Sequence, residues 1–324
     1  SSIPREIISL NDHTMKHLLY IIALGTLLVS CNTGESKRTH ILLNGSWEVA
    51  ESMDTLPPTD FQGQIRVPGL IDLAQPAFDK PGFTYADLGR ETTGDPGFGR
   101  KYYWYRKVIS LDTRPHDFAI LKVHKAKFGH AVYINGNFAG KYDYCFTPSF
   151  IEISSYLDFN AENEILIRVG ASPEQLPDSI PFGFEIEKSV YHAGIYDRVE
   201  LYMGEYPYIE NIQVVPDIDN ESIEAIVYLE NGNTPAGGKL KYTIREKESG
   251  ETVASGRSEN LTLGEHATDT VRLSVVIPDF RPWAPGTPFL YELEVDSEGD
   301  SRTVTFGMRE FRFDTISRLA LRRD

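Results

Sequence analysis

The strongest constraint on the fold is a dense series of strand-like segments after residue 38, where no helical period is sustained over three turns. Residues 102–111 form a β-branched and aromatic run, and residues 131–134 lead directly into Asn135-Gly136. Asn-Gly readily supplies the positive φ angles of a type I′ turn, so this segment predicts a β-hairpin. Further short strands are predicted at 150–153, 164–169 and 197–203. Their close spacing favours a sandwich over a parallel sheet with crossover helices.

The second half of the chain shows clear alternation of apolar and polar residues. Residues 223, 225, 227 and 229 are apolar and Glu224 is charged, and residues 291–295 repeat the pattern. Such strands have one buried and one solvated face. About seven strands in about a hundred residues are typical of an immunoglobulin-like sandwich. Because Gly204 and Pro207 interrupt the strand pattern, the sequence predicts an all-β fold of two sandwiches, over residues 40–205 and 206–313.

The N-terminal part has the pattern of a targeting segment. Residues 15–30 combine a short basic start, an apolar run and a small residue, which is typical of a signal peptide. The apolar run is shorter than the roughly 20 residues of a membrane-spanning helix. A buried helix is the alternative, but nothing in the sequence caps it. Residues 1–14 precede Met15 and are expected to have no structural role.

Residues 28–31, Leu-Val-Ser-Cys, resemble the lipobox of bacterial lipoproteins. The resemblance implies cleavage before Cys31 and attachment of lipid to that cysteine, with residues 31–39 as a tether. We therefore expect a protein anchored by lipid to a membrane of the bacterial cell envelope. The sequence leaves open whether it faces the periplasm or lies on the outer-membrane surface.

Composition excludes several functional classes. The formal net charge of −15, from 32 Lys+Arg and 47 Asp+Glu, argues against nucleic-acid binding, which needs clustered basic residues. Two cysteines, Cys31 and Cys145, exclude a disulfide scaffold and a four-cysteine zinc site. The eight histidines form no HExxH or HxH pair, and there is no Gly-x-Ser-x-Gly motif. We predict no metal site and no cofactor.

A series of segments resembles glycoside hydrolase family 2, which holds β-galactosidases, β-glucuronidases and β-mannosidases. The match covers about residues 40–313. It implies a sugar-binding jelly-roll β-sandwich followed by an immunoglobulin-like β-sandwich. Trp47, Trp104 and Tyr105, which two of the segments carry, are predicted to pack between sheets. In chain order the segments are 43–47, 67–69, 104–107, 132–136, 146–148, 165–169, 194–199, 283–291 and 306–311.

The resemblance also implies what this region does not carry. Family members cleave terminal β-linked sugars with two glutamates on a (β/α)8 barrel that follows the two sandwiches. A barrel needs roughly 250 residues, and only residues 314–324 follow Phe313. These are expected to be the truncated start of that barrel, through truncation, a frameshift or a short gene product. No catalytic residue is assigned, and this chain alone is expected to be inactive although the whole protein would be a retaining hydrolase.

Two loops are candidates for the rim of the substrate pocket. The first, residues 94–100, contributes Asp95 and Arg100, and the second, before Gly194, contributes Glu185, Glu187 and His192. The competing interpretations are a glycine-rich connector for the first loop and a solvated strand face or loop for the second. The expected partner is an oligosaccharide or glycoside, bound through the whole enzyme.

Two rival functions remain open at this point. The chain could be a stand-alone carbohydrate-binding envelope lipoprotein, in which exposed aromatic side chains stack on sugar rings, or a structural adhesive sandwich. An exposed aromatic pair spaced for neighbouring sugar rings would favour the first rival. The candidates are Tyr102, Tyr103, Tyr105, Tyr142 and Tyr144.

Overall fold

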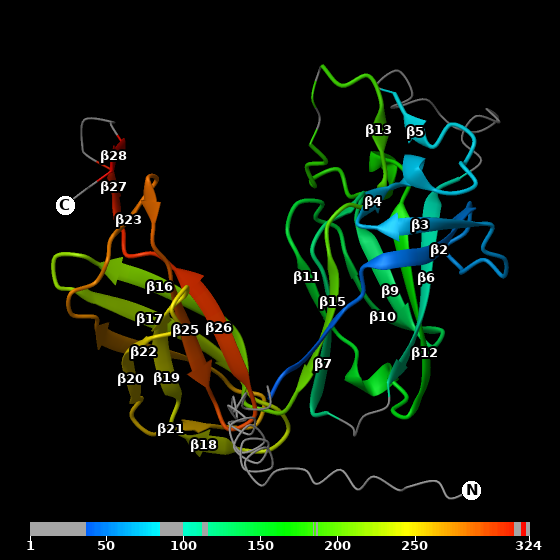
Figure 1. The fold of residues 1–324 in the computed structure, drawn as a ribbon. Coiled ribbons are helices and arrows are strands. Elements are labelled where there is room, and N and C mark those ends of the chain that lie inside the picture. The colour runs from blue at the N-terminus through cyan, green and yellow to red at the C-terminus, as the bar shows by residue number, and fades with distance from the viewer. Residues whose placement is uncertain are drawn as a thin grey trace, which may run out of the picture. The chain divides into compact units, whose positions relative to one another are not determined.

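A computed structural model describes residues 37–84, 100–111, 116–183, 185, 187–313 and 319–321. The predicted signal peptide, Cys31 and the candidate rim residue Asp95 lie outside this range. Apart from short 3₁₀ turns at Ile71–Leu73, Ser154–Tyr156 and Pro173–Gln175, the regular structure described is all strand. The all-β fold predicted from the sequence is confirmed (Figure 1).

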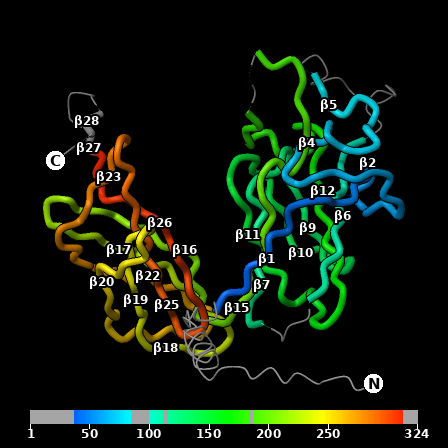
Figure 2. The backbone as a smooth tube through the Cα atoms, in the orientation of Figure 1, coloured from blue at the N-terminus to red at the C-terminus, as the bar shows by residue number. Residues whose placement is uncertain are grey.

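The first half of the chain forms a sandwich of two antiparallel sheets. The four-stranded sheet has the order β1 (Thr39–Leu42), β15 (Val199–Gly204), β7 (Phe118–Val123), β11 (Ser149–Glu152). Strands β1 and β15 are far apart in sequence but pair side by side (Figure 2). The six-stranded sheet has the order β10 (Asn137–Tyr142), β9 (His130–Ile134), β12 (Ala161–Gly170), β6 (Tyr102–Leu111), β2 (Gly45–Ser52), β3 (Gly63–Val67).

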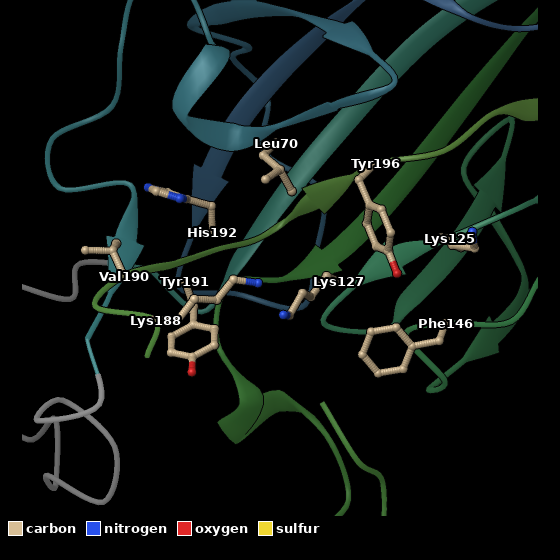
Figure 3. Close-up of a pocket in the computed structure, with 9 residues that line it drawn as sticks. All are labelled: Leu70, Lys125, Lys127, Phe146, Lys188, Val190, Tyr191, His192 and Tyr196. Carbon is tan, nitrogen blue, oxygen red and sulfur yellow. The ribbon is translucent and has the colours of Figure 1, made fainter. Parts of the chain in front are cut away.

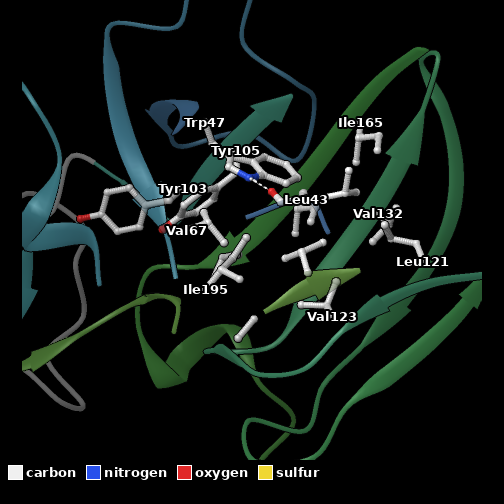
Figure 4. Packing of buried hydrophobic residues seen from close by; sticks show 14 of the residues in the cluster. Leu43, Trp47, Val67, Tyr103, Tyr105, Leu121, Val123, Val132, Ile165 and Ile195 are labelled. Carbon is white, nitrogen blue, oxygen red and sulfur yellow. Dashed lines mark hydrogen bonds between the residues drawn. The ribbon is translucent and has the colours of Figure 1, made fainter. Parts of the chain in front are cut away.

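The core of this sandwich lies between the inner faces of the two sheets (Figure 4). Trp47 is buried there, and its indole N–H donates to the carbonyl oxygen of Leu43 at 2.8 Å. Tyr103 and Tyr105 of β6 point into the same cluster. This confirms the predicted inward packing of Trp47 and Tyr105.

Trp104 is buried elsewhere, so its predicted place between the sheets is wrong. Because side chains alternate along a strand, Trp104 lies on the face of β6 opposite to Tyr103 and Tyr105. Its ring lies 5.2 Å from that of Tyr133, and the guanidinium of Arg168 lies 5.7 Å from its centroid. The middle of β6 is therefore covered on both faces.

The predicted hairpin at residues 131–140 is present. Asn135 and Gly136 have φ angles of 48° and 79°, which are the positive values that a type I′ turn requires. The Asn135 side chain also donates to the carbonyl oxygen of Tyr156 and accepts the backbone N–H of Glu164, both at 2.9 Å. The turn is thus fixed from both sides by hydrogen bonds.

The second sandwich follows Pro207. One sheet has the order β16 (Tyr208–Asp217), β17 (Ser222–Glu230), β22 (Thr268–Val276), and the other β20 (Thr252–Arg257), β19 (Lys241–Glu246), β25 (Tyr291–Asp296), β26 (Ser301–Phe306). Short pairs join β18 (Ala236–Gly238) to β21 (Leu261–Leu263) and β23 (Trp283–Ala284) to β24 (Thr287–Pro288). The apolar residues of β17 and β25 that alternate in the sequence are buried, as predicted. After this sandwich, β27 (Phe311–Phe313) pairs with β28 (Leu319–Leu321).

A buried ion pair between Arg38 and Asp300 connects the start of the described chain to the second sandwich. The guanidinium of Arg38, just before β1, donates through Nε to Asp300 at 2.9 Å and through Nη2 to the carbonyl oxygen of Ile209 at 2.9 Å. Asp300 is fully buried and also accepts the backbone N–H of Ile209 at 2.8 Å. Each charge is therefore hydrogen-bonded, as burial of a charge requires.

None of the helical segments in the described residues has the length and apolar character needed to traverse a membrane.

Buried His130 makes the first sandwich acid-sensitive. Its side chain bonds Ser149 at 2.8 Å, and burial lowers its pKa to about 4. Because an unfolded histidine binds a proton near pH 6.5, stability from this residue is present above that pH and falls by about 3 kcal/mol as pH drops to 4. His130→Gln should flatten this part of the pH dependence, measured by urea unfolding at pH 7 and pH 4.5.

The exposed residue His266 provides the matched control. His266→Gln should leave the pH dependence of the unfolding free energy unchanged. Equal pH slopes for wild type and His130→Gln would contradict the assignment.

Candidate functional site

A cavity of about 480 Å³ opens on the first sandwich (Figure 3). Ligand sites commonly have about 300–1,000 Å³ and combine apolar walls with a few polar groups. This cavity has both, because aliphatic and aromatic side chains alternate around it with lysines and a histidine. The lining residues are Leu70, Lys125, Lys127, Phe146, Lys188, Val190, Tyr191, His192 and Tyr196.

Short strands at the margin of the sandwich hold these residues. Strand β14 (Gly194–Ile195) pairs with both β4 (Gly69–Leu70) and β8 (Ala126–Lys127), which brings Leu70 and Lys127 to the same cavity. Gly194 has φ +149°, and a Cβ there would lie 2.6 Å from the Gly69 carbonyl oxygen. Only glycine allows β4 and β14 to approach this closely. The position of the cavity therefore depends on local strand packing.

The strand β13 (Tyr191–His192) forms the other side of the cavity and pairs with β5 (Gly82–Phe83). The ring of Tyr191 stacks on Phe83 at 5.3 Å. Its hydroxyl accepts the backbone N–H of Glu185 at 3.0 Å and donates to the carbonyl oxygen of the same residue at 2.5 Å. These two hydrogen bonds connect Tyr191 to the backbone of the segment before β13 and fix its position.

Tyr196 lies on the opposite side of the cavity, next to Phe146 in Figure 3. Its hydroxyl donates to the carbonyl oxygen of Cys145 at 2.5 Å. Burial raises the pKa of Tyr196 to about 12, so the phenol stays neutral at physiological pH. Phe146 leaves 47% of its surface exposed, which offers an apolar face to a bound molecule.

Three lysines give the cavity its charge. The ammonium of Lys125 pairs with Asp197 at 3.1 Å, and that of Lys188 lies 3.8 Å from the carboxylate of Glu185. Lys127 forms no ion pair within the part of the chain that the structure describes. Its ammonium lies 5.3 Å from the ring centroid of Tyr191 and 5.2 Å from that of Phe128. Burial lowers the pKa of Lys127, and the neighbouring Lys188 lowers it further.

The residues that the sequence predicted for the rim of the substrate pocket do not all lie at this cavity. His192 lines the cavity, and Glu185 lies at its edge through its contact with Lys188. Glu187 is exposed and is not among the lining residues. Neither glutamate lies in a strand. Asp95 is outside the described residues.

Arg100 has a structural role at the start of β6. Its Nη1 donates to the Tyr103 hydroxyl at 2.8 Å and to the Lys80 carbonyl oxygen at 2.9 Å, and its Nε lies 2.6 Å from Glu51. These contacts use the guanidinium to fix the chain around β6. Arg100 does not line the cavity described above.

The cavity lysines and Tyr196 are residues that the sequence reasoning missed. The pattern Lys125-Ala-Lys127 was a weak signal, because alternate residues of a strand share a face. Lys188 is distant in sequence and joins them only through folding. In the described residues no group of three or more His, Cys, Asp or Glu is arranged to hold a metal ion.

Comparison with known proteins finds similarity to one family of glycoside hydrolases. Residues 207–309 match the family model described as glycosyl hydrolases family 2. A putative beta-glucuronidase of Formosa agariphila is 27% identical over 242 residues, and a beta-galactosidase of Thermoanaerobacter pseudethanolicus is 26% identical over 228 residues. Together these matches support a member of glycoside hydrolase family 2.

The chain corresponds to only part of the length of those relatives. The matches cover 71% and 65% of the chain but 22% and 29% of the relatives' length. Solved structures share its fold. The beta-glucuronidase of Bacteroides uniformis aligns with a TM-score of 0.64 at 20% identity, covering 86% of this chain and 33% of that one. The beta-D-glucuronidase of Dictyoglomus thermophilum aligns with a TM-score of 0.59 at 21% identity, covering 89% and 46%.

Removing the Tyr191 hydroxyl should loosen one wall of the cavity. In Tyr191→Phe the backbone N–H and carbonyl of Glu185 lose their shared partner, which should cost about 1 kcal/mol of unfolding free energy. The Glu185 amide should exchange its hydrogen faster, measured by NMR. Tyr228→Phe, at a hydroxyl 3.4 Å from Gln213, should leave that amide unchanged. Unaltered exchange in Tyr191→Phe would contradict the role of the hydroxyl.

Proposed function

We propose that this chain is the non-catalytic N-terminal region of a family 2 glycoside hydrolase that releases a terminal β-linked sugar. In this proposal the cavity on the first sandwich forms part of the edge of the substrate pocket, and the two sandwiches support the barrel. The observation that carries the proposal is the combination of aromatic faces and hydrogen-bond donors in one cavity of about 480 Å³. The names of the relatives, beta-glucuronidase and beta-galactosidase, support a glycoside as substrate.

The lining of the cavity suits a sugar ring. A pyranose presents apolar C–H faces and a rim of hydroxyl groups. Exposed aromatic surface such as that of Phe146 can cover the C–H face, and lysine ammonium groups can donate to the hydroxyls. Leu70 and Val190 complete the apolar wall.

The carboxylates at the cavity are poorly suited to cleave a glycosidic bond. A retaining hydrolase needs two carboxyl groups about 5–5.5 Å apart, one of which must be protonated before the first step. Burial raises the pKa of Asp197, but the backbone N–H of Arg198 and the ammonium of Lys125 outweigh it, so the net pKa is lowered. An ionised, lysine-paired carboxylate is a poor general acid at neutral pH. Glu185 is exposed, and its carboxylate lies 3.8 Å from the ammonium of Lys188. We therefore assign the bond cleavage to the barrel.

Hydrolysis assays test whether bond cleavage requires the barrel. The purified 324-residue chain should give no turnover above the uncatalysed rate with the 4-nitrophenyl β-glycosides of galactose, glucuronic acid and mannose. Sequencing the DNA past the Asp324 codon in all frames should reveal a barrel with two glutamates. Turnover by this chain would contradict the non-catalytic role, and a stop codon with no barrel downstream would contradict the hydrolase.

A stand-alone carbohydrate-binding protein is the alternative. Of the five candidate tyrosines, Tyr103 and Tyr105 are buried and cannot stack on a sugar. Tyr144 is 52% exposed, and its ring lies 5.4 Å from that of Tyr142. Under this alternative Tyr144→Ala would abolish polysaccharide binding, whereas the cavity proposal places the binding residues elsewhere.

We further propose that the protein is lipid-anchored in the bacterial cell envelope through Cys31. In a bacterial host the chain should incorporate radioactive palmitate and partition into the detergent phase of Triton X-114. Cys31→Ser should remove both properties, because the thiol is the attachment point. Cys145→Ser is the matched control, since Cys145 is buried in the first sandwich. Labelling that survives in Cys31→Ser would contradict the anchor.

A further inference from the structure

Lys127 differs in its environment from the other two lysines of the cavity. The chain carries a formal net charge of −15, and each of the other two cavity lysines faces a carboxylate. Lys127 is partly buried and has no ion pair among the residues that the structure describes. Burial of an ammonium group costs free energy unless an opposite charge compensates for it.

The arrangement of Lys188 strengthens the local positive charge. The Lys188 ammonium lies 5.8 Å from the Tyr191 ring centroid, and that of Lys127 lies 5.3 Å from the same centroid. In Figure 3 the ends of the two side chains point toward each other across the cavity. Burial and the nearby charge of Lys188 lower the pKa of Lys127, and the carboxylate of Glu185 offsets them only in part. An anion between the two ammonium groups would relieve their repulsion.

From this geometry we propose that the cavity binds the negatively charged substituent of a sugar, a carboxylate or a sulfate, between Lys127 and Lys188. The proposal rests on the proposed function and names the substrate class of the same site. Tyr191 lies beneath both ammonium groups, and Phe146 and Val190 leave apolar surface for the rest of the ring.

The chemistry of the walls favours a sugar anion over a free inorganic anion. A small ion needs only charge, whereas this cavity adds Leu70, Phe146 and Val190 to the lysines. These apolar groups gain contact only from a ligand that carries C–H surface beside its negative charge. Carboxylate and sulfate both accept charge-assisted hydrogen bonds from ammonium groups, so the structure fits both.

Binding measurements on the 324-residue chain can separate the possibilities. The probes are methyl β-D-glucuronide, D-glucose 6-sulfate and methyl β-D-glucoside, titrated by calorimetry at low and high NaCl concentration. At least one of the two anions should bind about tenfold more tightly than the neutral glucoside, because a charge-assisted hydrogen bond is worth more than a neutral one. The preference should shrink as salt rises. The tighter of the two anions identifies the charged group.

Variants assign the effect to the lysines. Lys127→Met keeps the length of the side chain and should lower the affinity for the preferred anion about tenfold, which is more than it lowers the affinity for the neutral glucoside. Lys188→Met, at an exposed position, should act in the same direction without a risk to folding. Lys241→Met, at an exposed lysine of the second sandwich, should bind like wild type.

The outcomes separate this inference from the proposed function. Equal affinity for anionic and neutral sugars would overturn the inference and leave the hydrolase proposal intact. Failure of both anions to bind, or anion affinity that survives in both Lys127→Met and Lys188→Met, would also overturn it. The hydrolase proposal has its own test in the downstream DNA, which does not depend on anion binding.

Discussion

The structure of the first sandwich depends on the burial of β6 on both of its faces. Tyr103 and Tyr105 fill the space between the sheets, while Trp104 is covered on the opposite face by Tyr133 and Arg168. Strand β6 is also internal in its sheet, because it pairs with β12 along its whole length and with β2 at its start. Tyr105 belongs to the same buried cluster as Ile195 of β14, so the core supports the short strands that carry the cavity.

The sequence was sufficient to predict features that depend on residues close together in the chain. The Asn135-Gly136 turn and the alternation in β17 follow from local stereochemistry and from a period of two, and both are confirmed. The predicted direction of the Trp104 side chain was wrong. A buried aromatic residue of a strand can lie on either face of its sheet when other side chains cover the outer face, as Tyr133 and Arg168 do here. The cavity lysines were not found, since Lys127 and Lys188 meet only after β8 and the segment before β13 have folded. Arg100 was chosen for its loop, but its partners, Tyr103 and Lys80, could be known only from the structure.

Charge distribution links the fold to the proposed function. The acidic chain places carboxylates against two of the three cavity lysines. The pKa of one of them, Asp197, is lowered by the Arg198 backbone N–H and the Lys125 ammonium, which makes it a poor proton donor. Among the described residues Lys127 has no carboxylate partner, so Lys127 and the neighbouring Lys188 are the cations that the cavity offers to a ligand. A region built this way is suited to bind and orient a substrate while another domain supplies the acid and the nucleophile. Under the proposed function, the two sandwiches would contribute substrate binding and the barrel would supply the chemistry.

The most direct test of the account is to locate the bound sugar on the protein. Methyl NMR signals of Leu70 and Val190, in the cavity, can be followed during titration with methyl β-D-glucuronide, with Leu263 and Val275 of the second sandwich as internal references. The account predicts saturable shifts for Leu70 and Val190 and none for the references. Shifts confined to the surroundings of Tyr142 and Tyr144, or no shift at Leu70 and Val190, would contradict it.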